Sequence, residues 1–217
     1  MKKIIIVIVG LLFTQLTYGQ IITIKAGTSF SKLEWKLDKI NLDPPYKETL
    51  IGLSIFAGID YLNKKYYNLS SSIGYIQRGG RGEIPLTNSQ GNLTDSTITS
   101  KPGLNYFSFN TIIELKYPIK KNFIPFLCIG PRLDFLTSYS YHFDSVDDIN
   151  ELNNISYGLL IGGGIKYEFT KFQIGLRCDY YLDFDKVADW PQGTGVSGGE
   201  ITTNTITTEV SFAYRLK

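Results

Sequence analysis

The sequence predicts an all-β protein that folds as an eight-stranded antiparallel up-and-down barrel, and three observations support this fold class. Eight segments alternate apolar and polar residues with a period of two, as strands with two different faces do. The connections between these segments alternate between long and short. The last segment, residues 205–217, keeps its alternation to the end of the chain, with Val210, Phe212, Tyr214 and Leu216 on one face.

The first four predicted strands span residues 21–30, 49–62, 66–77 and 104–117. In these strands, mostly apolar residues occupy every second position, while mostly Ser, Thr, Asn, Gly and charged residues occupy the positions between them. The second and third strands are joined by a short turn at residues 63–65. Residues 31–47 and 78–103 are expected to form long polar loops.

The last four predicted strands span residues 123–138, 157–169, 172–184 and 205–217. The middle two are joined only by Thr170 and Lys171, which predicts a tight hairpin. Because Pro131 cannot donate a backbone hydrogen bond, we expect a β-bulge there. Residues 139–156 and 185–204 are again expected to be long loops, so both chain ends fall on the side of the short turns.

The polar face of the strands indicates a membrane barrel with a filled lumen. Most strand glycines lie on this face, where they make room inside a narrow eight-stranded barrel. Basic and acidic residues are balanced on it, as expected of buried charges that pair with one another. A soluble barrel or sandwich with a solvated polar face is the alternative. The predicted lumen charge network comprises Lys25, Glu114, Lys116, Arg132, Asp134, Lys166, Glu168, Arg177, Asp179, Glu209 and Arg215.

Aromatic residues gather at both ends of the predicted strands. Tyr67, Tyr117 and Phe169 lie beside short turns, whereas Phe107 and Tyr157 lie toward the long loops. Two aromatic belts with short turns on one side and long loops on the other are typical of transmembrane barrels of the bacterial outer membrane. We therefore expect periplasmic N- and C-termini and extracellular long loops.

The N-terminal residues predict export. Lys2 and Lys3 precede an apolar run at residues 4–12, and small residues precede Gln20. This pattern predicts a signal peptide at residues 1–19 and a mature barrel domain at residues 20–217, because the apolar run is short for a permanent membrane anchor.

Composition argues against several function classes. The chain has 22 basic and 20 acidic residues, which does not favour a nucleic-acid binder. Its two cysteines point to opposite faces, Cys128 inward and Cys178 outward, so they are not expected to pair. One His cannot form a zinc site by itself, and phosphate-binding and dinucleotide motifs are lacking. We expect neither a cofactor nor a metal.

Several short motifs stand out by their order and spacing, namely residues 24–27, residues 75–79, residues 125–126 with 130–131, Gly158 with Gly162 and Gly164, and Arg177. In these motifs the chain resembles the PorT-like family of small outer-membrane β-barrels. The resemblance implies the barrel fold and, for some members, a role in protein secretion. One departure is Tyr181, which replaces a glycine usual in the family and narrows the outer half of the lumen.

We therefore predict a non-enzymatic, monomeric outer-membrane barrel that contacts lipid and lipopolysaccharide and acts through its extracellular loops. It would serve as a scaffold, a surface-interaction protein or an accessory of an envelope or secretion complex. Trp190, in the last long loop, is the candidate contact residue, although it could equally pack over the barrel mouth.

Two alternative functions rest on the dimensions of the barrel or on specific residues. A small-solute porin is disfavoured because eight strands leave little free lumen. A lipid A-modifying enzyme would use Ser140 and His142, with the acidic residues 144–148 orienting the imidazole.

Asp183 and Asp185 are either a cation site at the mouth or ion-pair partners of Arg132 and Arg177.

Overall fold

The computed structural model describes residues 20–37, 46–87, 90, 93–119, 122–143, 152–190 and 198–216. The predicted signal peptide, residues 1–19, lies outside the described residues. No helix in the described part of the chain is long and apolar enough to cross a membrane.

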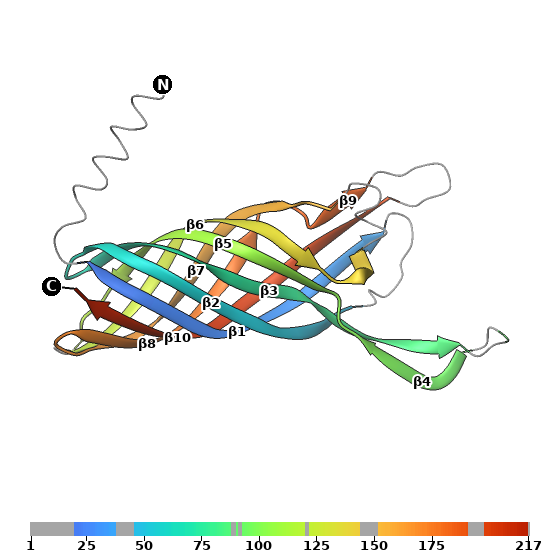
Figure 1. The fold of residues 1–217 in the computed structure, drawn as a ribbon, viewed down its shortest axis with the longest axis horizontal. Helices are drawn as coiled ribbons and strands as arrows, with labels where there is room; N and C mark the ends of the chain where they lie inside the picture. The colour runs from blue at the N-terminus through green and yellow to red at the C-terminus, as the bar shows by residue number, and fades with distance from the viewer. Residues whose placement is uncertain are drawn as a thin grey trace, which may run out of the picture.

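Eight long strands form the barrel wall in chain order, and every neighbouring pair is antiparallel. The first and last of them also pair, from Ile21 with Arg215 to Leu37 with Gly199, which closes the barrel (Figure 1). The predicted fold class is therefore confirmed. The wall strands are β1 (Ile21–Leu37), β2 (Glu48–Asn63), β3 (Tyr67–Thr87), β5 (Gly103–Lys116), β6 (Phe123–Tyr139), β7 (Ile155–Glu168), β8 (Phe172–Asp183) and β10 (Gly199–Arg215).

The outer ends of three wall strands are longer than the sequence predicts. Strand β1 continues to Leu37, β3 continues to Thr87 and β10 already begins at Gly199. The expectation that these ends are loops is wrong. Strands that leave the lipid band have water on the outside, so they pair without the apolar alternation that marks a strand inside the membrane.

Two short strands and one turn of helix complete the outer end. Strand β4 (Leu93–Ser100) pairs with the far half of β3, and this hairpin projects beyond the barrel (Figure 1). Strand β9 (Ala188–Trp190) pairs with the start of β10. A 3-10 turn, η2 (Tyr141–Phe143), follows β6.

The β-bulge expected at Pro131 is not there. Strand β6 keeps one register with β7 through the pair Pro131 and Leu159, and the register shift with β5 falls instead at Asn105 and Tyr106. A single proline removes one ladder hydrogen bond but does not require an inserted residue. The neighbouring Gly130 lets β5 approach closely, since a Cβ atom there would lie 1.9 Å from the Thr111 carbonyl oxygen.

The barrel is apolar outside and polar inside. Outward residues such as Ile24, Leu127 and Val210 are 56%, 69% and 58% exposed, whereas charged inward residues are almost fully buried. Aromatic rings cluster at the end where the turns are short, with Phe169 and Phe172 stacked 4.3 Å apart between their centroids. This distribution is the reverse of that in a soluble protein and is typical of a lipid-facing barrel.

Candidate functional site

The outer half of the lumen holds a four-residue ionic cluster, here called the outer cluster. Arg78 contacts Asp134 at 2.5 Å and Asp183 at 3.3 Å, and Arg132 pairs with the same two carboxylates. All four side chains are at most 9% exposed. Two guanidinium groups therefore balance two carboxylates in a site with almost no water contact.

Two tyrosine rings fill the space around this cluster. The Arg78 guanidinium lies 5.0 Å from the Tyr106 ring centroid and 4.9 Å from that of Tyr181, and Arg132 also lies 4.9 Å from Tyr181. These are cation–π distances. Tyr181 thus occupies the lumen between two cations, at the position where the PorT-like resemblance leads one to expect glycine.

A second ionic group, here called the middle cluster, lies on β5, β7, β8 and β10. Arg177 is its centre, with Asp179 at 2.6 Å, Glu114 at 3.8 Å and Glu209 at 3.9 Å. Lys166 contacts the other oxygen of Glu114 at 2.5 Å. The structure therefore brings these five predicted network residues together.

Lys25 lies on β1, among polar side chains of the lumen wall. Its ammonium group donates to Ser72 Oγ at 3.0 Å, and Ser72 donates in turn to Asn110 Oδ1 at 2.7 Å. The same ammonium lies 5.2 Å from the centroid of the Phe56 ring. Hydrogen bonds and an aromatic face thus stabilise this buried cation.

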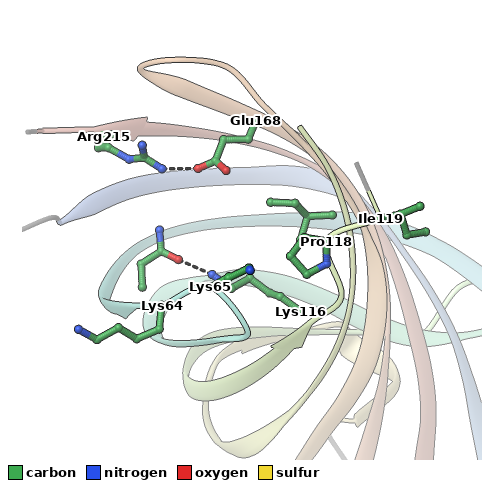
Figure 2. Close-up of a pocket in the computed structure, with 9 residues that line it drawn as sticks. Lys64, Lys65, Lys116, Pro118, Ile119, Glu168 and Arg215 are labelled. Carbon is green, nitrogen blue, oxygen red and sulfur yellow. Dashed lines mark hydrogen bonds and ion pairs between the residues drawn. The ribbon is translucent and has the colours of Figure 1, made fainter. Parts of the chain in front are cut away.

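Three predicted network residues lie at the barrel mouth near the chain ends rather than in the buried clusters. Arg215 pairs with Glu168, and Lys116 donates to Asn63 Oδ1 at 2.5 Å (Figure 2). The side chains of Arg215 and Glu168 are 36% and 25% exposed. These residues belong to a partly hydrated rim.

The outer mouth is covered by an aromatic cap. The Trp35 ring lies 6.3 Å from Phe143, 6.4 Å from Trp190 and 5.8 Å from Tyr46, between centroids. Phe143 is fully buried, and Trp190 is partly buried against the apolar cluster. Of the two roles expected for Trp190, the structure shows the packing role over the barrel mouth.

The His142 side chain lies between two serines at this end. Ser140 Oγ lies 3.1 Å from Nδ1, but the hydroxyl on Nε2, at 2.5 Å, belongs to Ser100 of β4. Ser140 also accepts a hydrogen bond from the Gly103 backbone N–H at 3.1 Å. The acidic residues 144–148 lie outside the described residues.

Two further expectations can be placed on the structure. Asp183 pairs with Arg132 and Arg78, while Asp185 accepts from Ser156 Oγ at 3.0 Å, so the ion-pair alternative describes Asp183 better than a cation site does. Within the described ranges, no group of three or more His, Cys, Asp or Glu side chains is arranged to hold a metal ion. Both cysteines are free, with Cys128 buried and Cys178 exposed, as their parity predicts.

Sequence reasoning missed two residues of the lumen and its outer rim, Arg78 and Ser100. Arg78 continues the inward positions of β3 after Asn68, Ser70 and Ser72, so extending the period-two pattern by one residue past Gln77 identifies it. The position of Ser100 depends on the pairing of β3 with β4, which no local sequence pattern predicts.

Comparisons with known proteins agree with this architecture. Residues 7–187 match the family model described as outer membrane protein beta-barrel domain. The crystal structure of the outer membrane protein OprG from Pseudomonas aeruginosa is similar, with 10% identity, coverage of 91% of this chain and 96% of that chain, and a TM-score of 0.54. Ail of Yersinia pestis, in complex with the heparin analogue sucrose octasulfate, gives 14% identity, 91% and 99% coverage, and a TM-score of 0.45. No curated protein matches the sequence.

Proposed function

This chain belongs to the family of outer membrane protein beta-barrel domains, and we propose that it is a non-enzymatic barrel that works through its extracellular end. The proposed role is that of a scaffold, a surface-interaction protein or an accessory of an envelope or secretion complex. The finer resemblance to PorT-like barrels supports the last role, because secretion functions are expected for some members of that family.

The filled lumen is the observation that carries this proposal. The outer cluster, the rings of Tyr106 and Tyr181 and the middle cluster follow one another inside the barrel. The aromatic cap covers the outer mouth. Because an eight-stranded lumen is just wide enough for its own side chains, little room is left for a solute path.

A conductance measurement tests this proposal. The folded protein, inserted into planar bilayers, is expected to show no stable single-channel steps. Folding of the protein in the same preparation is verified by the shifted gel migration of the unheated barrel. Large and reproducible steps would favour the alternative function, a small-solute porin.

We further propose the cellular location and membrane orientation that the sequence predicts. The signal peptide at residues 1–19 directs export, both termini face the periplasm, and the mature chain is a monomeric barrel in contact with outer-membrane lipid and lipopolysaccharide. N-terminal sequencing of the membrane-extracted protein is expected to begin at Gln20. Retention of Met1, or recovery of the chain as a soluble periplasmic protein, would contradict this location.

The β3–β4 hairpin is the proposed contact element at the extracellular end. Among the described residues, β4 pairs only with β3, so its other edge presents free backbone groups. Strand β4 contains one charged residue, Asp95, and neither of the residues, Lys and Pro, that commonly guard an exposed edge. Such an edge can accept an extended segment of a protein partner as an added strand.

Replacing residues 83–99 by a short turn tests the hairpin directly. The barrel is expected to keep its folded gel migration, because the wall pairs β3 with β5 up to Gly79 and Gly103. A partner of the envelope that co-purifies with the intact protein is expected to be lost. Unchanged co-purification would indicate that the partner contacts another extracellular loop.

A lipid A-modifying enzyme is the second candidate, since His142 lies between two serine hydroxyls. Mass spectrometry of lipid A separates the two proposals. We expect the same lipid A species from cells with the native protein and from cells with His142→Ala. A change in acylation that depends on His142 and Ser100 would establish the enzyme.

A further inference from the structure

The barrel mouth near the chain ends contains a cavity of about 550 Å³ (Figure 2). It lies among the β2–β3 turn, the β5–β6 turn, the β7–β8 hairpin and the end of β10. Four cationic side chains line it, together with the single carboxylate of Glu168. The four are Lys64, Lys65, Lys116 and Arg215.

The charges of this cavity are not balanced, in contrast to those of the outer cluster. Arg215 is paired with Glu168 on one side of the mouth, whereas the three lysines lie on the other side (Figure 2). Lys116 donates to the neutral oxygen of Asn63, which leaves its positive charge without compensation from that contact. Among the side chains that line the cavity, four cations therefore face one carboxylate.

The lysines differ in depth, which gives the cavity a floor and a rim. Lys116 is half-buried and its ammonium points into the mouth, while Lys64 and Lys65 are exposed in the turn. An anion that enters can therefore contact both the half-buried Lys116 and the exposed Lys65. Charge-assisted hydrogen bonds to several ammonium groups are the usual way in which proteins hold phosphates and carboxylates.

Apolar residues form the remaining wall. Pro118, Ile119 and Ile124 line the cavity beside the lysines. A volume of this order is within the range of about 300–1,000 Å³ found for small-molecule sites. The lining thus suits a molecule that has both an anionic group and an organic body.

We propose that this cavity binds a small organic anion that carries carboxylate or phosphate groups. A site recessed among three turns is reached by a small molecule more easily than by a flat layer of lipid headgroups. This site is separate from the proposed extracellular function, and the proposed orientation of the chain makes it a periplasmic site.

Titration of the folded mature protein in uncharged lipid nanodiscs tests the proposal. Citrate and pyrophosphate serve as probes at constant ionic strength, and sucrose serves as the uncharged probe. Saturable binding of at least one anion and none of sucrose is expected. A preference for citrate assigns the site to carboxylates, and a preference for pyrophosphate assigns it to phosphates. Because both mouths are accessible in a nanodisc, the result does not depend on the orientation in the cell.

Matched variants locate the binding. Lys116→Met and Lys65→Gln are each expected to weaken binding by about tenfold, because each removes a charged contact to the anion. Lys171→Gln makes the same change of charge in the β7–β8 turn at this mouth, but Lys171 does not line the cavity, and its effect is expected to stay within about twofold. If Lys116→Met does not fold, the exposed Lys65 provides the test.

Two results would overturn the proposal. The first is non-saturable binding of both anions by the native protein. The second is an equal loss of binding in Lys65→Gln and Lys171→Gln, which would mean that the net charge of this end, and not the cavity, attracts the anions.

Discussion

Arg132→Ala is the sharpest test of the ionic interior. The Arg132 side chain is fully buried between Asp134 and Asp183. Its removal leaves two carboxylates to share the single guanidinium of Arg78. Breaking a buried pair in this way typically costs about 3–5 kcal/mol, because a charge remains in a site that water does not reach.

Two comparison variants separate this cause from a general effect of mutation. Lys64→Ala removes a cation from an exposed turn and is expected to change stability by less than about 0.5 kcal/mol. The double variant Arg132→Met with Asp183→Leu removes one charge of each sign and leaves Arg78 paired with Asp134. It is expected to be more stable than Arg132→Ala, since apolar residues that replace a whole buried pair are often close to neutral.

Reversible urea unfolding from lipid vesicles, followed by tryptophan fluorescence, gives the free energies of unfolding. The reasoning would be refuted if Arg132→Ala lost no more stability than Lys64→Ala, because the inward face of the strands would then be wrongly assigned. A double variant as unstable as the sum of its two single variants would show that Arg132 and Asp183 are not coupled.

Three further predictions follow from the wall and the rim. Gly130→Ala is expected to destabilise the barrel by about 1–3 kcal/mol in the same unfolding assay, because the added methyl group meets backbone, whereas Gly103→Ala, whose Cβ atom would make only ordinary contacts at 3.9–4.0 Å, is tolerated. An apolar maleimide is expected to label Cys178 in the folded protein while the other cysteine, buried in the lumen, reacts only after unfolding. Hydrogen bonds from Lys186 and a second lysine hold the pKa of Glu200 below its ordinary value, so this pairing stabilises the outer end above the ordinary carboxyl pKa and is lost as the pH falls through the lowered pKa. The protection of the backbone amides at the start of β10, measured as the exchange rate relative to the intrinsic rate at each pH, is therefore expected to fall on acidification, and to fall less in Glu200→Gln.

The part of the fold inside the lipid band was predictable from sequence. Lipid on one side and a packed polar lumen on the other impose opposite demands on successive residues, so the period-two pattern gave the correct inward face for Arg132, Asp134 and Arg177. The pattern also placed Cys128 and Cys178 on opposite faces. Which carboxylate each Arg contacts depends on the register between strands, and alternation alone does not encode the register.

The outer end was not predictable in the same way. Residues 78–87 and 93–100 are rich in Gly, Ser and Thr and resemble a loop, yet they form the β3–β4 hairpin. Outside the membrane the backbone hydrogen bonds of the ladder hold such a ribbon without an apolar face. Because the predicted third strand ends at Gln77, the sequence prediction did not include Arg78, which belongs to the outer cluster.

The distribution of charge along the barrel separates groups needed for folding from groups free to bind. In the outer cluster, two guanidiniums and two carboxylates neutralise one another with almost no exposure, and any imbalance there would be costly to stability. At the mouth near the chain ends, Lys64 and Lys65 are exposed, so water screens their charges and the excess costs little. Charge that the fold does not require at the exposed Lys65 remains available to a ligand, and this is why Lys65→Gln is expected to change binding more than stability.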